Sequence, residues 1–122
     1  MSPTIPPEIS GQRYISLATF RKNGRPVYTP VWFAEENGRL YCMTSGKMGK
    51  SKRIRNDPKV KIAPSTMRGK IIGPKFSATA RFLQVEEFQH ARKLINAKYW
   101  LARVPFLWSR TDTYFEITPD TA

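Results

Sequence analysis

A short basic segment near the middle of the chain carries the residues best suited to bind an anion. Residues 44–51 read TSGKMGKS. They match the phosphate loop of nucleotide hydrolases, G-x-x-x-x-G-K-[ST], except that Thr44 replaces the first glycine. Gly49, Lys50 and Ser51 are in place. Because backbone N–H groups and a lysine hold the phosphate in such loops, the segment predicts an anion site.

The flanking sequence supports an anion site at the start of a helix. A strand is expected to end at Thr44, and residues 48–56 are expected to form a short helix that stops at Asn56-Asp57-Pro58. Free N–H groups and the helix dipole favour an anion near Gly49. Lys50, Ser51 and Arg53 can point at the same place, and the basic run also contains Lys47, Lys52 and Arg55.

Hydrolysis of ATP or GTP does not fit the surrounding elements. The nucleotide-hydrolase loop follows a strand of a parallel α/β sheet, and an acidic residue at the end of another strand holds magnesium. Here the preceding strand belongs to a predicted antiparallel hairpin. We therefore interpret the segment as an anion site without hydrolytic chemistry.

The composition favours one globular domain with a strongly basic surface. The 122 residues include 21 Lys and Arg against 9 Asp and Glu, a formal net charge of +12, which attracts polyanions. The single cysteine, Cys42, is expected in the core and argues against a disulfide or a metal site. No apolar run reaches the roughly 20 residues that span a bilayer, and no signal peptide is recognised, so we expect a cytoplasmic protein.

Two Asn-Gly pairs predict the hairpins that precede the basic segment. Asn23-Gly24 and Asn37-Gly38 supply the backbone angles of tight turns, so residues 13–44 are expected to form a three-stranded meander. Pro30 lies within the middle strand, where its missing N–H indicates an edge or a bulge, or a strand side that faces a ligand. The predicted strands are 13–21, 26–35 and 39–44.

The rest of the chain predicts three more strands and one longer helix. Alternating apolar residues favour strands at 59–65, 75–85 and 110–119. Phe88, Ala91, Ile95, Tyr99 and Ala102 form the apolar stripe of a helix at 86–103. The fold class is mainly β (α+β), in the order β-β-β-α-β-β-α-β, with an antiparallel six-stranded barrel and two outer helices. We expect a flexible arm at 1–12 and one domain at 13–119.

Three motifs together resemble a known superfamily. They are YISLATFRKNGRPVYTPVWFAEENGRLYCMTSG, GKSKRIRNDPKVKIAP and RGKIIGPKFSATARFL, which cover about residues 13–85. Their order resembles the split β-barrel enzymes of the pyridoxamine 5′-phosphate oxidase superfamily, and within it the group that uses the deazaflavin coenzyme F420. The resemblance implies a homodimer with cofactor sites at the interface.

The resemblance also implies which residues hold the cofactor. One strand would run beside the tricyclic ring, and the next strand end with its loop and helix would hold the phosphate. The ring residues would be Tyr28, Thr29, Pro30, Val31 and Trp32, and the phosphate residues Thr44, Ser45, Lys50, Ser51 and Arg53. A second copy would complete each pocket through one of Lys61, Arg68, Lys70 or Lys75.

The function implied is hydride transfer between reduced F420 and an electron-poor small molecule. The oligoglutamate tail of F420 suits a chain of net charge +12 better than FMN does. The cofactor supplies the chemistry, so no catalytic residue is assigned. Tyr28, Tyr41 and Lys98 are candidate proton donors. No dinucleotide-binding glycine fingerprint is present, so a separate enzyme is expected to reduce the cofactor.

Several alternatives remain open from the sequence. FMN could replace F420, or a small basic β-barrel could bind nucleic acid through a positive groove with aromatic platforms. The one histidine, His90, is expected at the surface, with a role as a haem ligand as the alternative. An aromatic cluster is expected to pack on the barrel, to contact a second copy, or to cover the pocket: Trp100, Phe106, Leu107 and Trp108.

Overall fold

The computed structural model describes residues 4–44, 49–99 and 113–120. Within these ranges it contains seven strands and two helices. The strands are β1 (Tyr14–Phe20), β2 (Pro26–Val31), β3 (Ala34–Glu36), β4 (Arg39–Thr44), β5 (Lys59–Ser65), β6 (Phe76–Phe82) and β7 (Thr113–Pro119). The helices are α1 (Gly49–Asn56) and α2 (Val85–Lys98).

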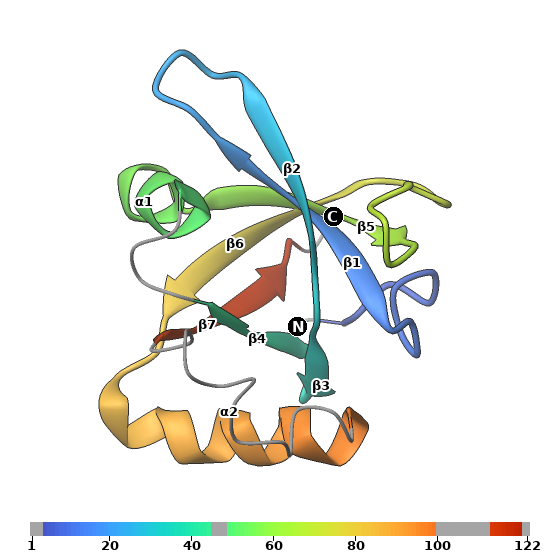
Figure 1. The fold of residues 1–122 in the computed structure, drawn as a ribbon, viewed down its shortest axis with the longest axis vertical. Helices are drawn as coiled ribbons and strands as arrows, with labels where there is room; N and C mark the ends of the chain where they lie inside the picture. The colour runs from blue at the N-terminus through green and yellow to red at the C-terminus, as the bar shows by residue number, and fades with distance from the viewer. Residues whose placement is uncertain (1–3, 45–48, 100–112, 121–122) are drawn as a thin grey trace.

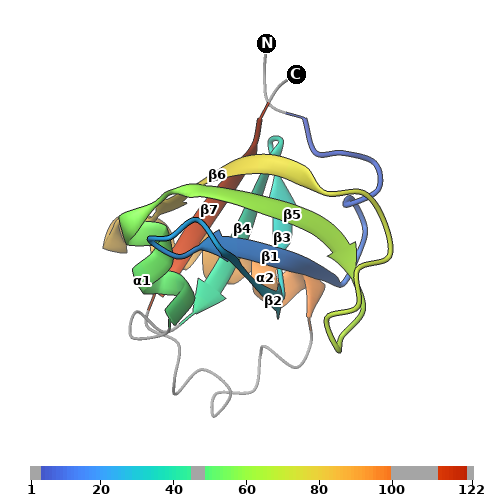
Figure 2. The ribbon, with the colours of Figure 1, turned by 90° about the horizontal axis from the view of Figure 1, so that it is seen from above.

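All seven strands belong to one antiparallel sheet. Its order is β2-β1-β5-β6-β7-β4-β3, and each neighbouring pair is antiparallel. The sheet curls round on itself into a half-barrel, with α2 running across one end (Figure 1). Figure 2 shows α1 beside the open side of the curl, next to β1. The predicted mainly β split barrel with two outer helices is therefore confirmed.

The number and pairing of the early strands differ from the prediction. Residues 26–35 form two strands, β2 and β3, so the sheet has seven strands rather than six. At Phe33, the Tyr99 hydroxyl takes the place of a strand partner: it accepts from the Phe33 N–H at 3.1 Å and lies 2.9 Å from the Phe33 carbonyl oxygen. The predicted meander is also wrong, because β2 and β3 lie at opposite ends of the sheet.

Both Asn-Gly pairs form hairpin turns, but the two turns differ. Asn37 and Gly38 both have positive φ angles, 53° and 76°, as a type I′ turn requires. In the first hairpin only Gly24 has a positive φ, 85°, and its N–H donates to the Arg21 carbonyl at 2.8 Å. That pattern is typical of a longer hairpin loop in which the glycine ends a turn.

Two apolar clusters stabilise the fold. One fills the half-barrel, where Leu17, Ile62 and Phe115 are fully buried. The other joins α2 to the sheet through Ala91, Ile95 and Tyr99, three residues of the predicted stripe. Helix α2 ends at Lys98 rather than 103, since Tyr99 has extended backbone angles; residues 102 and 103 lie outside the described ranges. Neither described helix has the length and hydropathy that a bilayer span requires.

The segment before β1 contacts the barrel. Ile9 is fully buried in the barrel cluster. The Glu35 carboxylate accepts hydrogen bonds from the Ser10 hydroxyl at 2.8 Å and the Gly11 N–H at 2.9 Å. The flexibility of residues 1–12 and the domain bounds 13–119 stay predictions.

Candidate functional site

Helix α1 lies where the two ends of the sheet approach each other. It follows β4, which is second from one end of the sheet. Its residue Arg53 donates from Nε to the Thr19 hydroxyl on β1, second from the other end, at 2.6 Å. The helix therefore bridges the split of the barrel. Side chains on its inner face are directed toward the barrel interior.

Lys50 is the one charged residue among the buried side chains of α1. It is 9 % exposed, whereas the neighbouring Lys52 is exposed. Burial lowers the pKa of Lys50, and the charge on Arg53 lowers it further. Within the described ranges the Lys50 ammonium has no hydrogen-bond or ion-pair partner. A buried cation of this kind is stabilised by a bound anion.

Two buried hydroxyl groups accompany Lys50. Thr44, at the end of β4, is 4 % exposed, and Ser51 is fully buried. Thr44 lies on the face of β4 that also carries the buried Leu40 and Cys42. Burial raises the pKa of Cys42 to about 12, so its thiol is neutral and does not balance the charge on Lys50. Ser45 and Lys47 lie outside the described residues.

Arg53 supplies a second cation at the first turn of α1. A Cβ atom placed on Gly49 would lie 2.7 Å from Arg53 Nη1, so the guanidinium folds back over the start of the helix. Free N–H groups and the positive end of the helix dipole are found at this turn. Arg55 instead lies 5.0 Å from the ring centre of Phe82 and faces another direction. The structure therefore brings Lys50, Ser51 and Arg53 together and separates Arg55 from them.

Strand β2 forms one edge of the sheet, as Pro30 indicated. Pro26 and Pro30 cannot donate to β1, so their backbone nitrogens belong on the open edge. Tyr28 lies midway between them and has the same parity along the strand. Its N–H and carbonyl oxygen are therefore directed to the open edge as well. This edge offers one donor between two prolines.

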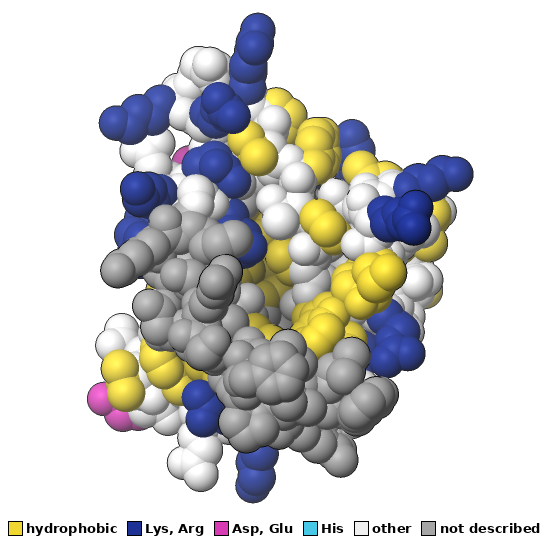
Figure 3. All heavy atoms as spheres, in the orientation of Figure 1, with side chains coloured by type: hydrophobic (Ala, Val, Ile, Leu, Met, Phe, Trp, Pro, Cys, Tyr) yellow, Lys and Arg dark blue, Asp and Glu magenta, His cyan; other side chains and the backbone are white. Residues whose placement is uncertain are grey.

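The inner face of the β1–β2 pair lies beside Arg53 of α1. Thr19, the hydroxyl partner of Arg53, is directly opposite Val27 on β2. Thr29 and Val31 lie on the same face as Val27, and successive residues of this face are about 7 Å apart along the strand. In Figure 3, apolar side chains line a recessed strip across this face, and Lys and Arg gather on the side of α1 and the β1–β2 hairpin. A ligand with an anionic end and an apolar ring fits that arrangement.

The predicted ring residues do not all share one surface. Thr29 and Val31 lie on the inner face of β2, whereas Tyr28 and Pro30 are exposed on the other face. Trp32 stacks on Tyr99, with ring centres 4.7 Å apart and planes at 6°. Of the predicted ring residues, Thr29 and Val31 therefore lie on the face of β2 that is directed toward α1. The Trp32 ring instead packs on Tyr99, the residue that follows α2.

The candidate proton donors occupy three separate places. Tyr28 accepts a hydrogen bond from Lys75 Nζ at 3.1 Å on the exposed face of β2. Burial raises the pKa of Tyr41, which lies edge-on to His90. Burial lowers the pKa of Lys98 to about 8, and its Nζ donates to the Gln12 carbonyl at 2.5 Å. They do not form one catalytic group.

The remaining sequence candidates lie away from α1. His90 is exposed and lies 2.6 Å from the Glu36 carboxylate, as expected for a surface residue. Lys61, Arg68 and Lys70 are exposed, and Lys75 contacts Tyr28 of its own chain. No group of metal-ligating side chains occurs among the described residues. The cluster Trp100, Phe106, Leu107 and Trp108 lies outside the described ranges.

The sequence did not identify two contributors to this region. Thr19 was assigned only to a strand, yet its hydroxyl holds Arg53. Tyr99 was assigned to the apolar stripe of α2, yet its hydroxyl ties α2 to Phe33 and lies 2.5 Å from the Arg13 carbonyl oxygen. Alternation along residues 14–20 could have placed Thr19 on the inner face, because side chains two positions apart in a strand share a face and Leu17 lies two positions before Thr19.

Comparisons with known proteins agree with this architecture. A family model described as pyridoxamine 5′-phosphate oxidase matches residues 1–121. No curated protein sequence matches the chain. Three solved structures illustrate the likeness in fold, and at these identities they show the fold alone.

The first is HutZ, the heme storage protein from Vibrio cholerae: TM-score 0.72, 14 % identity, 92 % of this chain and 84 % of that chain covered. The second is a candidate 5-nitroimidazole antibiotic resistance protein from Bacteroides thetaiotaomicron: TM-score 0.66, 18 % identity, 91 % and 75 % covered. The third is described as a domain-swapped dimer: TM-score 0.63, 22 % identity, 87 % and 79 % covered.

Proposed function

The chain belongs to the pyridoxamine 5′-phosphate oxidase family, and from that premise we propose that it is an F420-dependent oxidoreductase. Its substrate would be an electron-poor small molecule that exchanges hydride with the deazaflavin. The observation that carries the proposal is the Lys50 ammonium, which is 9 % exposed and has no described partner. A cofactor phosphate would supply the missing anion.

The residues at α1 fit a phosphate group. Lys50 and Arg53 supply two positive charges, and Gly49 leaves room for the guanidinium at the helix start. Thr44 and Ser51 add hydroxyl groups on the inner side. Such a set binds a phosphate monoester through charge-assisted hydrogen bonds. Ser45, also proposed for this site, lies outside the described residues.

The edge of β2 fits a ring that carries alternating donors and acceptors. The N–H and carbonyl oxygen of Tyr28 would meet the polar edge of the ring, and Thr29 and Val31 would contact it from the inner face. Pro30 leaves no competing N–H beside them. The bound cofactor would supply the hydride chemistry, while the protein positions the ring against the substrate and excludes water.

The charge distribution favours F420 over FMN. Both carry a phosphate, but the oligoglutamate tail of F420 adds carboxylates beyond it. Exposed cations gather on the side of α1 and of the β1–β2 hairpin (Figure 3), and neither element contains an acidic residue. They include Arg21, Lys22, Arg25 and Lys52. FMN remains the second candidate, because the family fold and the phosphate subsite would serve it equally.

We further propose that two copies assemble, with each completing the other's cofactor site. The likeness to a domain-swapped dimer supports a homodimer. Tyr28 and Ile72 expose large apolar surfaces, 45 % and 53 %, on the side of β2 and the loop after β5. Lys61, Arg68, Lys70 and Lys75 are the candidate residues that a partner copy would contribute.

Titration of the purified full chain with F420 and with FMN, followed by cofactor fluorescence, tests the proposal. We expect binding of F420 in the micromolar range or tighter. Lys50→Ala should weaken binding about 30-fold or more, because it removes a charge-assisted hydrogen bond to the phosphate. Lys52→Ala is the matched control, since Lys52 is exposed on the same helix, and it should change the affinity less than threefold.

Three results would count against the proposal. Binding of FMN without F420 would replace the deazaflavin assignment with the second candidate. Equal effects of Lys50→Ala and Lys52→Ala would show that general charge, rather than the α1 site, attracts the cofactor. Tight binding of a single-stranded oligonucleotide at physiological salt, with neither cofactor bound, would favour a nucleic-acid-binding barrel.

A further inference from the structure

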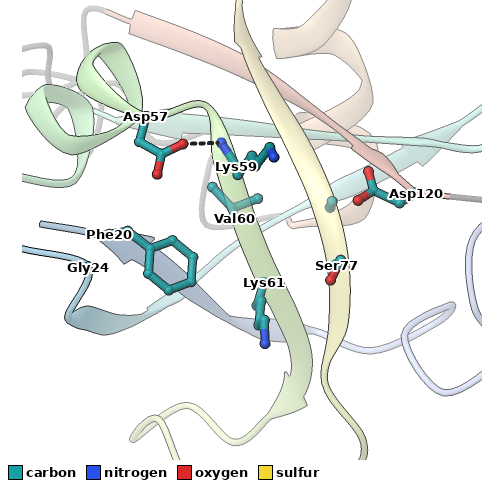
Figure 4. A pocket seen from close by; sticks show the side chains of 9 residues that line it. Phe20, Gly24, Asp57, Lys59, Val60, Lys61, Ser77 and Asp120 are labelled. Atoms are coloured by element: carbon teal, nitrogen blue, oxygen red, sulfur yellow. Dashed lines mark hydrogen bonds between the residues drawn. The ribbon is translucent and has the colours of Figure 1, made fainter. Parts of the chain in front are cut away.

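Thr19 on β1 carries a buried hydroxyl group that contacts α1, although it is not one of the predicted phosphate residues. It is fully buried, and its hydroxyl accepts a hydrogen bond from Arg53 Nε at 2.6 Å. The next residue, Phe20, lines a hollow on the outer face of the sheet together with the exposed Lys61 and Ser77 (Figure 4). Because neighbouring side chains of a strand point to opposite faces, Thr19 is directed inward, toward α1.

Thr19 and Gly49 fix the Arg53 guanidinium from two sides. Thr19 binds the Nε–H. Gly49 leaves room for Nη1, since a Cβ atom on Gly49 would lie 2.7 Å from this nitrogen. The two terminal nitrogens of Arg53 therefore lie beside the first turn of α1, where backbone N–H groups lack helical partners. An arginine whose Nε is already bound can still offer both terminal nitrogens to two oxygens of one anion.

The anchor of Arg53 is uncharged, and this preserves the positive charge for a ligand. Arg81 is the contrasting case, because the carboxylates of Glu87 and Glu116 lie 3.1 Å and 3.2 Å from its guanidinium. Within the part of the chain that the structure describes, Arg53 forms no ion pair. The Thr19 hydroxyl thus orients the guanidinium without neutralising it. A carboxylate in its place would cancel the charge that attracts an anion.

An anchor for Arg53 is needed because Lys50 is close. Burial lowers the pKa of Lys50, and the charge of Arg53 lowers it further, so the two cations repel each other. An arginine without an anchor would turn away from Lys50 into solvent, and its rotational freedom would be lost when an anion binds. The hydrogen bond to Thr19 holds the side chain in place before binding, which reduces that cost.

We propose that Thr19 is a positioning residue of the α1 site. Its hydroxyl holds Arg53 Nε, so that the terminal nitrogens of Arg53 bind two oxygens of a phosphate monoester while Lys50 binds the same group. Thr19 acts through Arg53 and does not contact the phosphate. This inference rests on the phosphate site proposed above, but it does not depend on the choice between F420 and FMN, since both carry that phosphate.

Residue-resolved NMR titration of the ¹⁵N-labelled full chain with inorganic phosphate tests the role of Thr19 without any cofactor. Phosphate should produce saturable shifts of the amide signals of Gly49, Lys50 and Ser51. Thr19→Val removes the hydroxyl and keeps the branched shape, and it should weaken phosphate binding about fivefold, the effect of one hydrogen bond. Thr19→Ser keeps a hydroxyl, and its affinity should stay within about twofold of the native value.

A second readout separates positioning from a general structural role. The Nε–H signal of Arg53 should be protected from solvent exchange in the native chain and in Thr19→Ser, and it should lose that protection in Thr19→Val. Thr79→Val, the same substitution at an exposed position on β6, is the matched control and should leave phosphate affinity unchanged. The dispersion of each spectrum reports whether the variant is folded. Thr19→Ala removes the same hydroxyl and takes the place of Thr19→Val if that variant does not fold.

The outcomes distinguish the role of Thr19 from the proposed function. Native affinity in Thr19→Val, or equal losses in Thr19→Val and Thr19→Ser, would reject the positioning role and leave the phosphate site in place. No saturable shifts at α1 in the native chain would overturn both the phosphate site and the role of Thr19. Phosphate binding at α1 with the expected Thr19 effects, but without binding of F420 or FMN, would support the role of Thr19 and refute the proposed oxidoreductase.

Discussion

Among the residues that the structure describes, buried charged side chains occur in two regions, which differ in how the charge is paired. On the α2 side, Glu116 is 6 % exposed and lies 3.2 Å from Arg81, which also pairs with Glu87 at 3.1 Å; Arg39 approaches Glu116 at 3.9 Å. At α1, Lys50 is 9 % exposed and no described residue pairs with it. The first region is paired within the chain, whereas no described residue balances the charge of Lys50, which the proposed cofactor phosphate would do.

The difference separates a structural role from a binding role. A buried charge that is paired links elements of the fold, here β6, β7 and the start of α2. A buried charge without a partner destabilises the fold unless a ligand offsets its desolvation. Such sites trade stability for binding. Substitutions in the two regions should therefore change stability in opposite directions.

Arg81→Ala should produce the largest change. It leaves the buried Glu116 carboxylate with Tyr41 and the more distant Arg39 but without its closest cation, so we expect the free energy of unfolding to fall by about 2 kcal/mol. Hydrogen bonds to Glu87 and Glu116 raise the pKa of Arg81, which agrees with a strong pairing. Chemical denaturation at pH 7 measures the change, and cofactor affinity should stay within threefold. An unchanged midpoint would remove the contrast between the regions.

Lys50→Met should have the opposite sign. Replacing a buried, unpaired ammonium by an apolar side chain of similar length should raise the free energy of unfolding by about 1 kcal/mol when no anion is present. Phosphate or sulfate should stabilise the native protein more than the variant, because only the native site binds it. A variant that is less stable than the native protein in anion-free buffer would show that Lys50 already has a structural role.

Tyr28→Pro tests whether the backbone N–H of Tyr28 binds the cofactor ring in the proposed site. A proline at the open edge removes one N–H without breaking the β1 ladder, as Pro26 and Pro30 already illustrate. Loss of one hydrogen bond to the ring should weaken the cofactor about fivefold. Tyr28→Ala is the control, since it removes the same side chain and keeps the N–H. Equal affinity of the two variants would show that the backbone of Tyr28 does not contact the ring.

The sequence predicted those parts of the fold that depend on local chemistry. Asn37-Gly38 specified a type I′ turn, and the prolines of β2 specified an edge strand. The sequence could not show that β2 and β3 lie at opposite ends of the sheet. The break between the two strands is at Phe33, whose N–H donates to the Tyr99 hydroxyl, 66 positions further along the chain. Long-range contacts of this kind leave no periodic pattern in the sequence.

The same limit applies to the candidate site. The motif predicted a cation at position 50, and helical spacing separates the inward Lys50 from the outward Lys52. The sequence placed Trp32 beside the ring, but its stacking on Tyr99 depends on how α2 packs. Thr19 became part of the site only because α1 bridges the split of the barrel.

The smallest expected effect is a change in the free energy of unfolding with pH that comes from Lys98, a further partly buried lysine. Burial lowers the pKa of Lys98 from 10.5 to about 8. Between these two values the unfolded chain holds a proton that the folded chain has released, so the free energy of unfolding should rise as the pH rises through this window. Below about pH 8 both states are protonated, and Lys98 contributes no slope.

Lys98→Met isolates this contribution: the rise between pH 8 and 10.5 should be smaller in the variant than in the native chain, because only Lys50, whose pKa burial also lowers, still adds a slope of that sign. Denaturant titrations at half-unit pH steps measure the stability of both proteins, and Lys93→Met, at an exposed position on α2, controls for general charge.

The contacts of Lys98 differ from those of Lys50. The Lys98 ammonium donates to the Gln12 carbonyl and lies 3.5 Å from the ring centre of Phe33, whereas Lys50 has neither kind of contact among the described residues. Added phosphate should therefore leave the Lys98 slope unchanged, while it raises stability through Lys50; a phosphate-dependent Lys98 slope would mean that both lysines serve one anion site.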